Sequence, residues 1–127
     1  MAPPRISTAE SLVMQAVWAR GPLGVEELLA EVGAAQGWGE ATLRTLIHRL
    51  IKKGALKSER QGGRTTYGAL LSREDYLTTE SRGLLDRLFG GQLTPLVAHL
   101  SRGQALSPQD VARLKRLVAE LDTDEED

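Results

Sequence analysis

The chain has 127 residues, a length that fits one domain or two very small ones. Its formal net charge is −1, which excludes a uniformly basic, histone-like protein. It has no cysteine, which excludes disulfide frameworks, thiolate zinc sites and cysteine nucleophiles. No apolar run approaches the roughly 18 residues that a membrane span needs, and the N-terminal residues lack the apolar core of a signal peptide. We therefore expect a cytoplasmic protein without membrane insertion.

Charge is divided unevenly along the chain. Residues 1–71 carry a net charge of +3 and residues 72–127 a net charge of −4. Within the first part, residues 39–64 contain seven basic and two acidic side chains. A basic half followed by an acidic half indicates one module that binds a polyanion and a second module with another task. Chance placement of surface charge is the simpler alternative.

Helical spacing of apolar residues predicts three short helices in the first 53 positions. Ser7 and Glu10 have the spacing of a capping box, in which a hydroxyl and a carboxylate satisfy backbone N–H groups where a helix begins. Glycine and proline at 21–22 stop this helix, and Gly54 suits the left-handed cap that ends the third. The expected elements are a helix after Ser7, a short extended piece over 23–25, a helix from Glu26 to about Gly33, and a helix from about Glu40 to Lys53.

The pattern then changes to two short strands, 55–61 and 64–70, separated by Gly62-Gly63, a pair that favours a two-residue hairpin turn. Three helices followed by a basic hairpin is the order of a winged helix-turn-helix domain. The predicted fold is therefore mainly α with a small β-hairpin wing, and residues 1–71 are expected to be a DNA-binding domain. The alternative is an α+β module whose hairpin only covers the core. Basic residues on both the third helix and the hairpin argue against that alternative.

The third predicted helix has two different faces on a helical wheel. One face is a narrow apolar stripe, and the opposite face carries hydroxyls and bases, with no acid beyond Glu40 at its start. Small residues let a helix approach base edges, threonine methyls can contact a thymine methyl, and arginine can reach guanine or phosphate. We interpret this face as a DNA-recognition surface, whereas an ordinary solvated face would more often mix glutamate and lysine. Its members are Ala41, Thr42, Arg44, Thr45, His48, Arg49 and Lys52.

From Ser72 onward the pattern is helical throughout. A long helix follows the cap at 72–75 and is broken by Gly90-Gly91, a short helix over 93–100 has Pro95 in its first turn, and Ser107-Pro108 begins the last helix. The acidic tail, 122–127, is expected to be frayed.

Three helices of this size cannot bury their apolar faces well alone, so we expect residues 72–127 to be a helical domain that forms a homodimer. Packing against the chain's own N-terminal module is the alternative. The residues assigned to dimerisation are Leu84, Leu85, Leu88, Phe89, Leu96, Leu114, Leu117 and Leu121.

Several segments follow one known pattern in order along almost the whole chain, from Ile6 to about Leu121. They are Ile6–Glu10, Val13-Met14, Val17-Trp18, Gly21–Leu23, Trp38, Ala41–Leu46, Arg49-Leu50, Lys52–Leu56, Tyr67, Ser72–Tyr76 and Leu85–Gly91. In these segments the chain resembles the penicillinase repressor family (BlaI/MecI/CopY), which are winged-helix transcriptional repressors. Agreement in order over this length is more specific than any one segment.

The resemblance implies a homodimer that binds inverted repeats in double-stranded promoter DNA, commonly of TACA/TGTA type in the family. By position, Thr42, Arg44 and Thr45 match the base-reading residues, and Arg60 and Arg64 lie on the wing. In the β-lactam-responsive members a membrane sensor-protease cuts an Asn-Phe bond in the C-terminal module. His99-Leu100 is the aligned pair here, and we take it as the candidate cleavage site.

Some positions depart from the family pattern. Gly39 replaces the serine that usually caps the recognition helix, and Ala41 stands where a lysine is frequent, which removes one phosphate contact. His48 occupies a variable position and is expected to adjust the sequence that is read. The absence of cysteine excludes the Cys-rich motif of the copper-responsive branch.

Enzyme chemistry has little support in the sequence. The two histidines, His48 and His99, are far apart and lack metal-ligand spacing, and no base is spaced to activate Ser107. We therefore expect a non-enzyme without a cofactor or metal. The second function class is a winged-helix interaction module that dimerises without sequence-specific DNA binding, and a gel shift on the gene's own upstream region separates the two.

Overall fold

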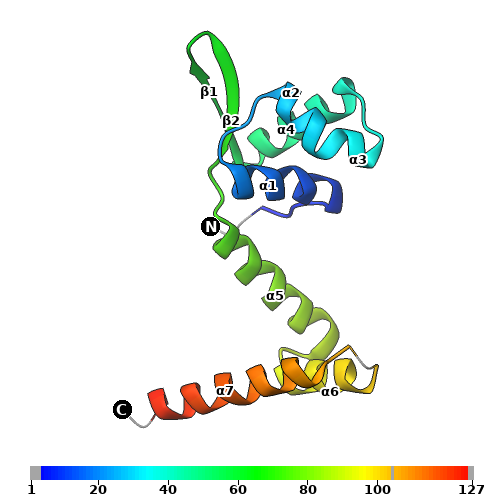
Figure 1. Ribbon diagram of the computed structural model, residues 1–127, viewed down its shortest axis with the longest axis vertical. Helices are drawn as coiled ribbons and strands as arrows, with labels where there is room; N and C mark the ends of the chain where they lie inside the picture. Colours follow the sequence, from blue (N-terminus) through cyan, green and yellow to red (C-terminus); the bar gives the residue numbers. More distant parts are fainter. Residues whose placement is uncertain (1–3, 104, 126–127) are drawn as a thin grey trace. The chain divides into compact units, whose positions relative to one another are not determined.

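The computed structural model describes residues 4–103 and 105–125, which form two compact units divided between Glu80 and Ser81 (Figure 1). In chain order the first unit holds α1 (Thr8–Arg20), α2 (Val25–Leu28), the π-helical turn η1 (Leu29–Gly33), α3 (Ala34–Gln36), α4 (Glu40–Lys52), β1 (Leu56–Gln61) and β2 (Arg64–Ala69). Helix α5 (Arg73–Phe89) continues into the second unit, which also holds α6 (Leu93–Arg102) and α7 (Pro108–Glu125). The predicted fold, mainly α with a hairpin wing, is confirmed.

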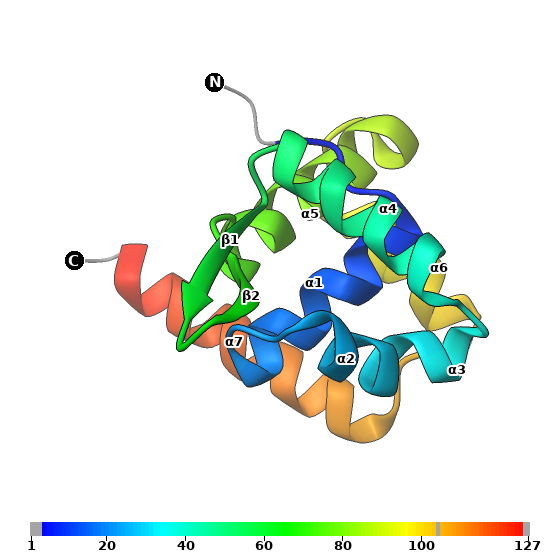
Figure 2. The same ribbon diagram turned by 90° about the horizontal axis from the view of Figure 1, so that it is seen from above.

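The core of the first unit lies among α1, η1 and α4, which all contact one another, and strand β2, which packs on α1 (Figure 2). Twelve buried side chains form it, and Met14, Leu28, Leu43 and Leu50 are each 0% exposed. Burying one such side chain contributes roughly 1.5–3 kcal/mol. The apolar stripe predicted for the third helix therefore faces this core and turns the opposite face of α4 outward.

Helix α1 begins with the predicted capping box. The Ser7 N–H donates to Glu10 Oε1 at 2.8 Å, and the Glu10 N–H donates to Ser7 Oγ at 3.1 Å. Helix α4 ends at Lys52, and Gly54 follows with a φ of +79°, in the left-handed region that the sequence predicts for it.

The second predicted helix is longer than expected, because the helical segment of α2, η1 and α3 continues to Gln36 instead of ending near Gly33. Gly33 has an ordinary helical φ of −58°, and the left-handed residue that ends the segment is Gly37, with φ 73°. A Cβ at Gly33 would lie 3.1 Å from a Leu29 methyl and 3.3 Å from the Trp38 carbonyl oxygen. Gly33 therefore serves close packing, and its reading as a helix stop is wrong.

The hairpin has the predicted turn and an extra attachment. Gly62 and Gly63 have φ of 59° and 81°, as the two central residues of a type I′ turn require, and strands β1 and β2 pair in an antiparallel register. Leu23, in the predicted extended piece, forms a β-bridge with Tyr67 of β2. Val25 already belongs to α2, so the extended piece is shorter than predicted.

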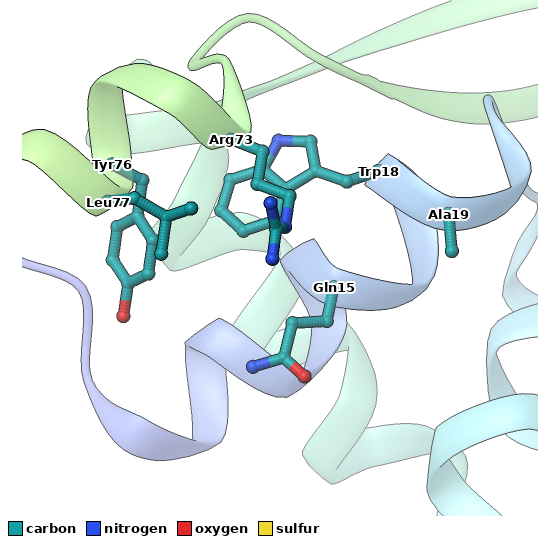
Figure 3. A pocket seen from close by; sticks show the side chains of 6 residues that line it. All are labelled: Gln15, Trp18, Ala19, Arg73, Tyr76 and Leu77. Atoms are coloured by element: carbon teal, nitrogen blue, oxygen red, sulfur yellow. The ribbon is translucent and has the colours of Figure 1, made fainter. Parts of the chain in front are cut away.

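The contact boundary lies inside α5, between Glu80 and Ser81, whereas the functional division expected from the sequence lies at 71/72. The Trp18 indole N–H donates to the Leu71 carbonyl at 2.8 Å, and the Trp18 and Tyr76 ring centroids are 5.3 Å apart. Figure 3 shows the residues around these two rings. These contacts hold the first turns of α5 on α1, so the turns belong to the first unit.

The second unit contains the predicted helices with one difference at its end. Ser107 and Asp110 cap α7 reciprocally, with both hydrogen bonds at 3.1 Å. The tail predicted to be frayed is helical up to Glu125, and the Thr123 hydroxyl donates to the Ala119 carbonyl at 3.0 Å, as it does in a continuing helix. Residues 126–127 of that prediction lie outside the described residues. None of the helices in the described part of the chain is both long and apolar enough to span a bilayer.

Candidate nucleic-acid interface

The outward face of α4 collects the residues predicted to read DNA. All of the predicted members are exposed, while the stripe residues Leu43, Leu46, Ile47 and Leu50 are buried beneath them. The α4 residues on this exposed face are Ala41, Thr42, Arg44, Thr45, His48, Arg49 and Lys52. Thr45 also donates its hydroxyl to the Ala41 carbonyl at 3.0 Å, which fixes the orientation of its methyl group. Hydroxyls, a methyl and bases therefore occupy one continuous helix surface.

The start of α4 lacks a side-chain cap, in line with the glycine at its N-cap. Gly39 is extended, with φ −86° and ψ 178°, and no side chain in the described structure bonds to the first turn from that position. Glu40 supplies the negative charge that a helix N-terminus favours and accepts a hydrogen bond from Arg44 at 3.3 Å. Arg44 is thus oriented along the helix by its neighbour one turn earlier.

Four of the seven bases in residues 39–64 pair with a carboxylate, which the charge count along the sequence does not reveal. Arg44 pairs with Glu40, Lys57 with Glu59 at 2.7 Å, Lys53 with Glu10 at 2.5 Å, and Arg64 with Glu27. Glu10 and Glu27 lie outside the stretch, in α1 and α2. The bases without an ion pair in the described residues are Arg49, Lys52 and Arg60. Positive charge available to a polyanion is therefore concentrated on the C-terminal half of α4 and on the wing.

The pair of Glu10 and Lys53 is structural. The Glu10 side chain is only 2% exposed, and Lys53 Nζ also donates to the Arg5 carbonyl at 2.9 Å. Burial alone would raise the pKa of Glu10, but hydrogen bonds from Lys53 and Ser7 outweigh it, so the pKa is lower than its ordinary value. This ion pair ties the start of α1 to the end of α4.

Arg44 and the wing residue Arg64 are brought together by the fold. Both line a hollow of about 360 Å³ between the start of α2, the start of α4 and β2, and Glu26 and Glu40 line the same hollow. The other wing base, Arg60, lies on β1 and bonds to the Gly63 carbonyl at 3.4 Å. Arg49 and Lys52 lie further along α4 and do not line this hollow.

A second hollow, of about 370 Å³, lies between α1 and the first turns of α5 (Figure 3). Trp18 and Tyr76 are half-buried in it, and its other four lining residues, Gln15, Ala19, Arg73 and Leu77, are exposed. A site this open cannot bury most of a small ligand.

The described residues contain no cluster of three metal-ligating side chains, and His48 and His99 are both exposed on separate helices.

The residues assigned to dimerisation lie on exposed or half-buried helix faces of the second unit. Leu84, Leu88, Leu117 and Leu121 are exposed, and Leu85, Phe89, Leu96 and Leu114 are half-buried. The candidate cleavage pair, His99 and Leu100, is exposed near the end of α6.

Comparison with known proteins gives matches over nearly the whole chain. The penicillinase repressor family model matches residues 6–120. A penicillinase repressor of Bacillus licheniformis is 30% identical over 117 residues, covering 92% of this chain and 91% of the relative. The methicillin resistance regulatory protein MecI of Mammaliicoccus sciuri is 26% identical over 113 residues, covering 89% of this chain and 92% of the relative.

Among solved structures, the monomeric form of Bacillus licheniformis BlaI in complex with the blaP half-operator is 34% identical to this chain. Its TM-score is 0.53, and the match covers 58% of this chain and 90% of that one. The match therefore extends over a part of this chain close in length to its first unit.

Proposed function

Because the chain belongs to the penicillinase repressor family, we propose that it is a transcriptional repressor that binds promoter DNA through α4 and the β1–β2 wing. The observation that carries this proposal is the outward face of α4, which presents hydroxyls, a methyl and bases on a helix whose opposite face is buried. The relatives are bacterial proteins, and in bacteria promoter DNA lies in the cytoplasm, so we place this protein there. Regulation of this kind requires no enzyme chemistry.

The residues of α4 divide into two groups by position. The first turns of a recognition helix reach base edges, so we assign Thr42, Arg44 and Thr45 to base reading. Arg49 and Lys52, one to two turns later and without an ion pair in the described residues, are assigned to phosphate contacts. Ala41, at the start of the helix, and His48, between the two groups, shape the surface that meets the groove. Arg60 extends the phosphate contacts onto the wing.

We further propose that the chain acts as a homodimer on an inverted repeat. The support is the row of exposed leucines on the second unit, for example Leu88 at 64% and Leu121 at 54% exposed, which a second copy would cover. A two-fold dimer presents its two recognition helices to two half-sites in opposite orientation, and operator symmetry mirrors this arrangement.

Relief of repression is proposed to occur by severing the second unit, for which a membrane-bound sensor-protease is the partner implied by the family. Helix α6 is ten residues long and follows Gly90-Gly91, and short helices open locally at low cost. Limited proteolysis with mass spectrometry tests this step. First cuts at or near His99-Leu100 support it, and full protection of residues 90–103 while the C-terminal tail is cut would contradict it.

A comparison of the affinities for two DNA duplexes tests the main proposal. The full chain is titrated onto a duplex from its own gene's upstream region and onto a random duplex at the same salt concentration. We expect the upstream duplex to be bound at least about 10³-fold more tightly, because that is the usual lower range of specific over non-specific binding. Equal affinities would support an interaction module that does not read sequence.

A pair of arginine variants locates the reading surface. Arg44→Ala should weaken upstream binding by about 1–3 kcal/mol and reduce the preference over random DNA. Arg73→Ala removes the same charge from an exposed residue of α5 and should change neither. Equal losses on both duplexes for Arg44→Ala would remove its base-reading role.

A further inference from the structure

The carboxylate of Glu27 joins the wing to the start of α2. Its Oε1 accepts the backbone N–H of Gly24 at 3.0 Å and pairs with Nη2 of Arg64. Gly24 is the residue before α2, Glu27 lies in the first turn of that helix, and Arg64 is the first residue of β2. One oxygen atom therefore holds two segments that are distant in the sequence.

Gly24 provides the space for this arrangement. A Cβ at this position would lie 2.9 Å from Arg64 Nη2, 3.2 Å from Arg64 Nε and 3.3 Å from the Thr65 carbonyl oxygen. Gly24 has a φ of −84°, which any residue adopts, so its backbone conformation does not require glycine. The guanidinium of Arg64 lies against this position, which explains why a residue without a Cβ is found there.

A backbone attachment lies next to this ion pair. Leu23 and Tyr67 exchange both hydrogen bonds of a β-bridge, at 3.1 and 2.8 Å, one residue before Gly24 and three residues after Arg64. Strand β2 is thus fixed to the start of α2 at two neighbouring points, by its backbone at Tyr67 and by the charged side chain of Arg64 next to the turn.

We propose that Arg64, Glu27 and Gly24 form a latch that sets the position of the wing relative to the recognition helix, and that Arg64 is a positioning residue rather than a phosphate ligand. The proposal rests on the DNA-binding function proposed above and refines the role of one of its wing residues. A phosphate would have to displace a carboxylate that the Gly24 N–H already holds in place. Arg49 and Lys52 have no such competitor in the described residues.

The two roles of Arg64 predict opposite signs for neutralising Glu27. If Arg64 contacts phosphate, removal of a competing and repelling carboxylate raises DNA affinity. If Arg64 latches the wing, removal of its partner loosens the wing and lowers affinity. Glu27→Gln is the suitable variant, because the amide oxygen still accepts the Gly24 N–H while the charge is lost.

The experiment compares the full chain with Glu27→Gln, Gly24→Ala and Arg64→Ala on one operator duplex. We expect each variant to bind about 2- to 5-fold more weakly, the range of a surface ion pair, and the double variant Glu27→Gln/Arg64→Ala to bind no more weakly than either single one. Glu26→Gln is the matched control: this neighbouring exposed carboxylate lines the same hollow without an ion pair in the described residues, and its loss should not weaken binding.

Salt dependence and hydrogen exchange give two further readouts. Arg64→Ala should leave the slope of log K against log salt unchanged, whereas loss of a phosphate ligand reduces it by about 1. In the free protein, amide exchange at Tyr67 should be faster in Glu27→Gln and Gly24→Ala than in Glu26→Gln. The exchange readout needs no DNA, so it tests the latch even if the DNA-binding function fails. Tighter DNA binding by Glu27→Gln with unchanged exchange would overturn the latch.

Discussion

The two units of the chain bury their apolar side chains to very different extents. The first encloses a core cluster of twelve buried hydrophobic side chains among the residues described, including several with 0% exposure. In the second, none of the side chains that the structure describes over 81–123 is buried, and Leu117 and Leu121 are 51% and 54% exposed. Both units have amphipathic helices, but only in the first unit do these helices bury their apolar faces against one another.

This difference separates two sources of stability. A unit with a closed core is stable by itself, whereas helices with exposed leucine faces gain stability only when another surface covers them. We infer that the first unit folds independently and that the second is completed by a second copy of the chain. On this inference DNA reading and assembly belong to different parts of the molecule, and we expect that each can be perturbed without the other.

Removal of the second unit is expected to have the largest effect. A fragment that ends at Glu80 should remain folded and monomeric, with helix content matching α1–α4 and the first turns of α5. It should bind an inverted repeat about 10²–10⁴-fold more weakly because bivalency is lost. Circular dichroism, sedimentation and a binding titration measure the three properties. A dimeric fragment, or a fragment that binds the inverted repeat as tightly as the full chain, would contradict the assignment of dimerisation to the second unit.

Leucine-to-alanine substitutions should distinguish the two units, because their effects on the free energy of unfolding should depend differently on protein concentration. Leu43→Ala removes a fully buried side chain of α4 and should lower the free energy of unfolding by about 2–5 kcal/mol at any protein concentration. Leu117→Ala should destabilise the chain only at concentrations where copies associate. Urea unfolding at two protein concentrations measures both, and a concentration-independent effect of Leu117→Ala would argue for burial within one chain.

Loss of a basic side chain on α4 that has no ion pair in the described residues should have a smaller effect, restricted to DNA binding. Arg49→Ala is expected to weaken operator and random duplexes alike and to reduce the salt slope by about 1, because a phosphate contact carries no sequence information. Arg116→Ala, an exposed arginine of α7, serves as the control and should change neither quantity. Titrations at several salt concentrations decide this, and an equal effect of both variants would place DNA contacts on the second unit as well.

The smallest expected effect concerns the pH dependence of the first unit. The pKa of Glu10 is lowered from its ordinary value of 4.5 in the folded chain, so the ionised carboxylate stabilises the fold at neutral pH. That stabilisation is lost as the pH falls below about 4.5 through the folded-state pKa. Glu10→Gln should therefore be less stable than the wild type at neutral pH, with a difference that narrows in acid.

Thermal unfolding over a series of pH values measures the Glu10 contribution. Glu59→Gln is the control, because its partner Lys57 lies half exposed at the hairpin surface and screening by water weakens such pairs. A difference between Glu10→Gln and wild type that stays constant from neutral pH into acid would contradict the assigned role of the ion pair.

Local signals made most of the fold predictable. The capping box at Ser7 and Glu10, the Gly62-Gly63 turn and the stripe on α4 each involve residues close together in the sequence, and each has the predicted structure. The second helix was predicted less well because Gly33 has two possible uses, as a helix stop and as a close contact. Only the approach of Trp38 and Leu29 in three dimensions decides between them.

The electrostatics of the interface were the least predictable part. Counting charges over residues 39–64 assigned Lys53 and Arg64 to a basic stretch, but their partners Glu10 and Glu27 belong to helices far away in the sequence. The division within α5 likewise depends on a long-range contact, because the Trp18 hydrogen bond to Leu71 joins two segments far apart in the sequence. Long-range pairings of this kind have no local signature.

Sedimentation equilibrium of the full chain without DNA tests the central claim most directly. At micromolar concentration we expect a mass about twice the 13.8 kDa of one chain, and a return to one chain when Leu117→Glu places a charge on the exposed face of α7. A chain that remains at 13.8 kDa over the concentration range in which it binds its operator would contradict the inference that a second copy completes the second unit.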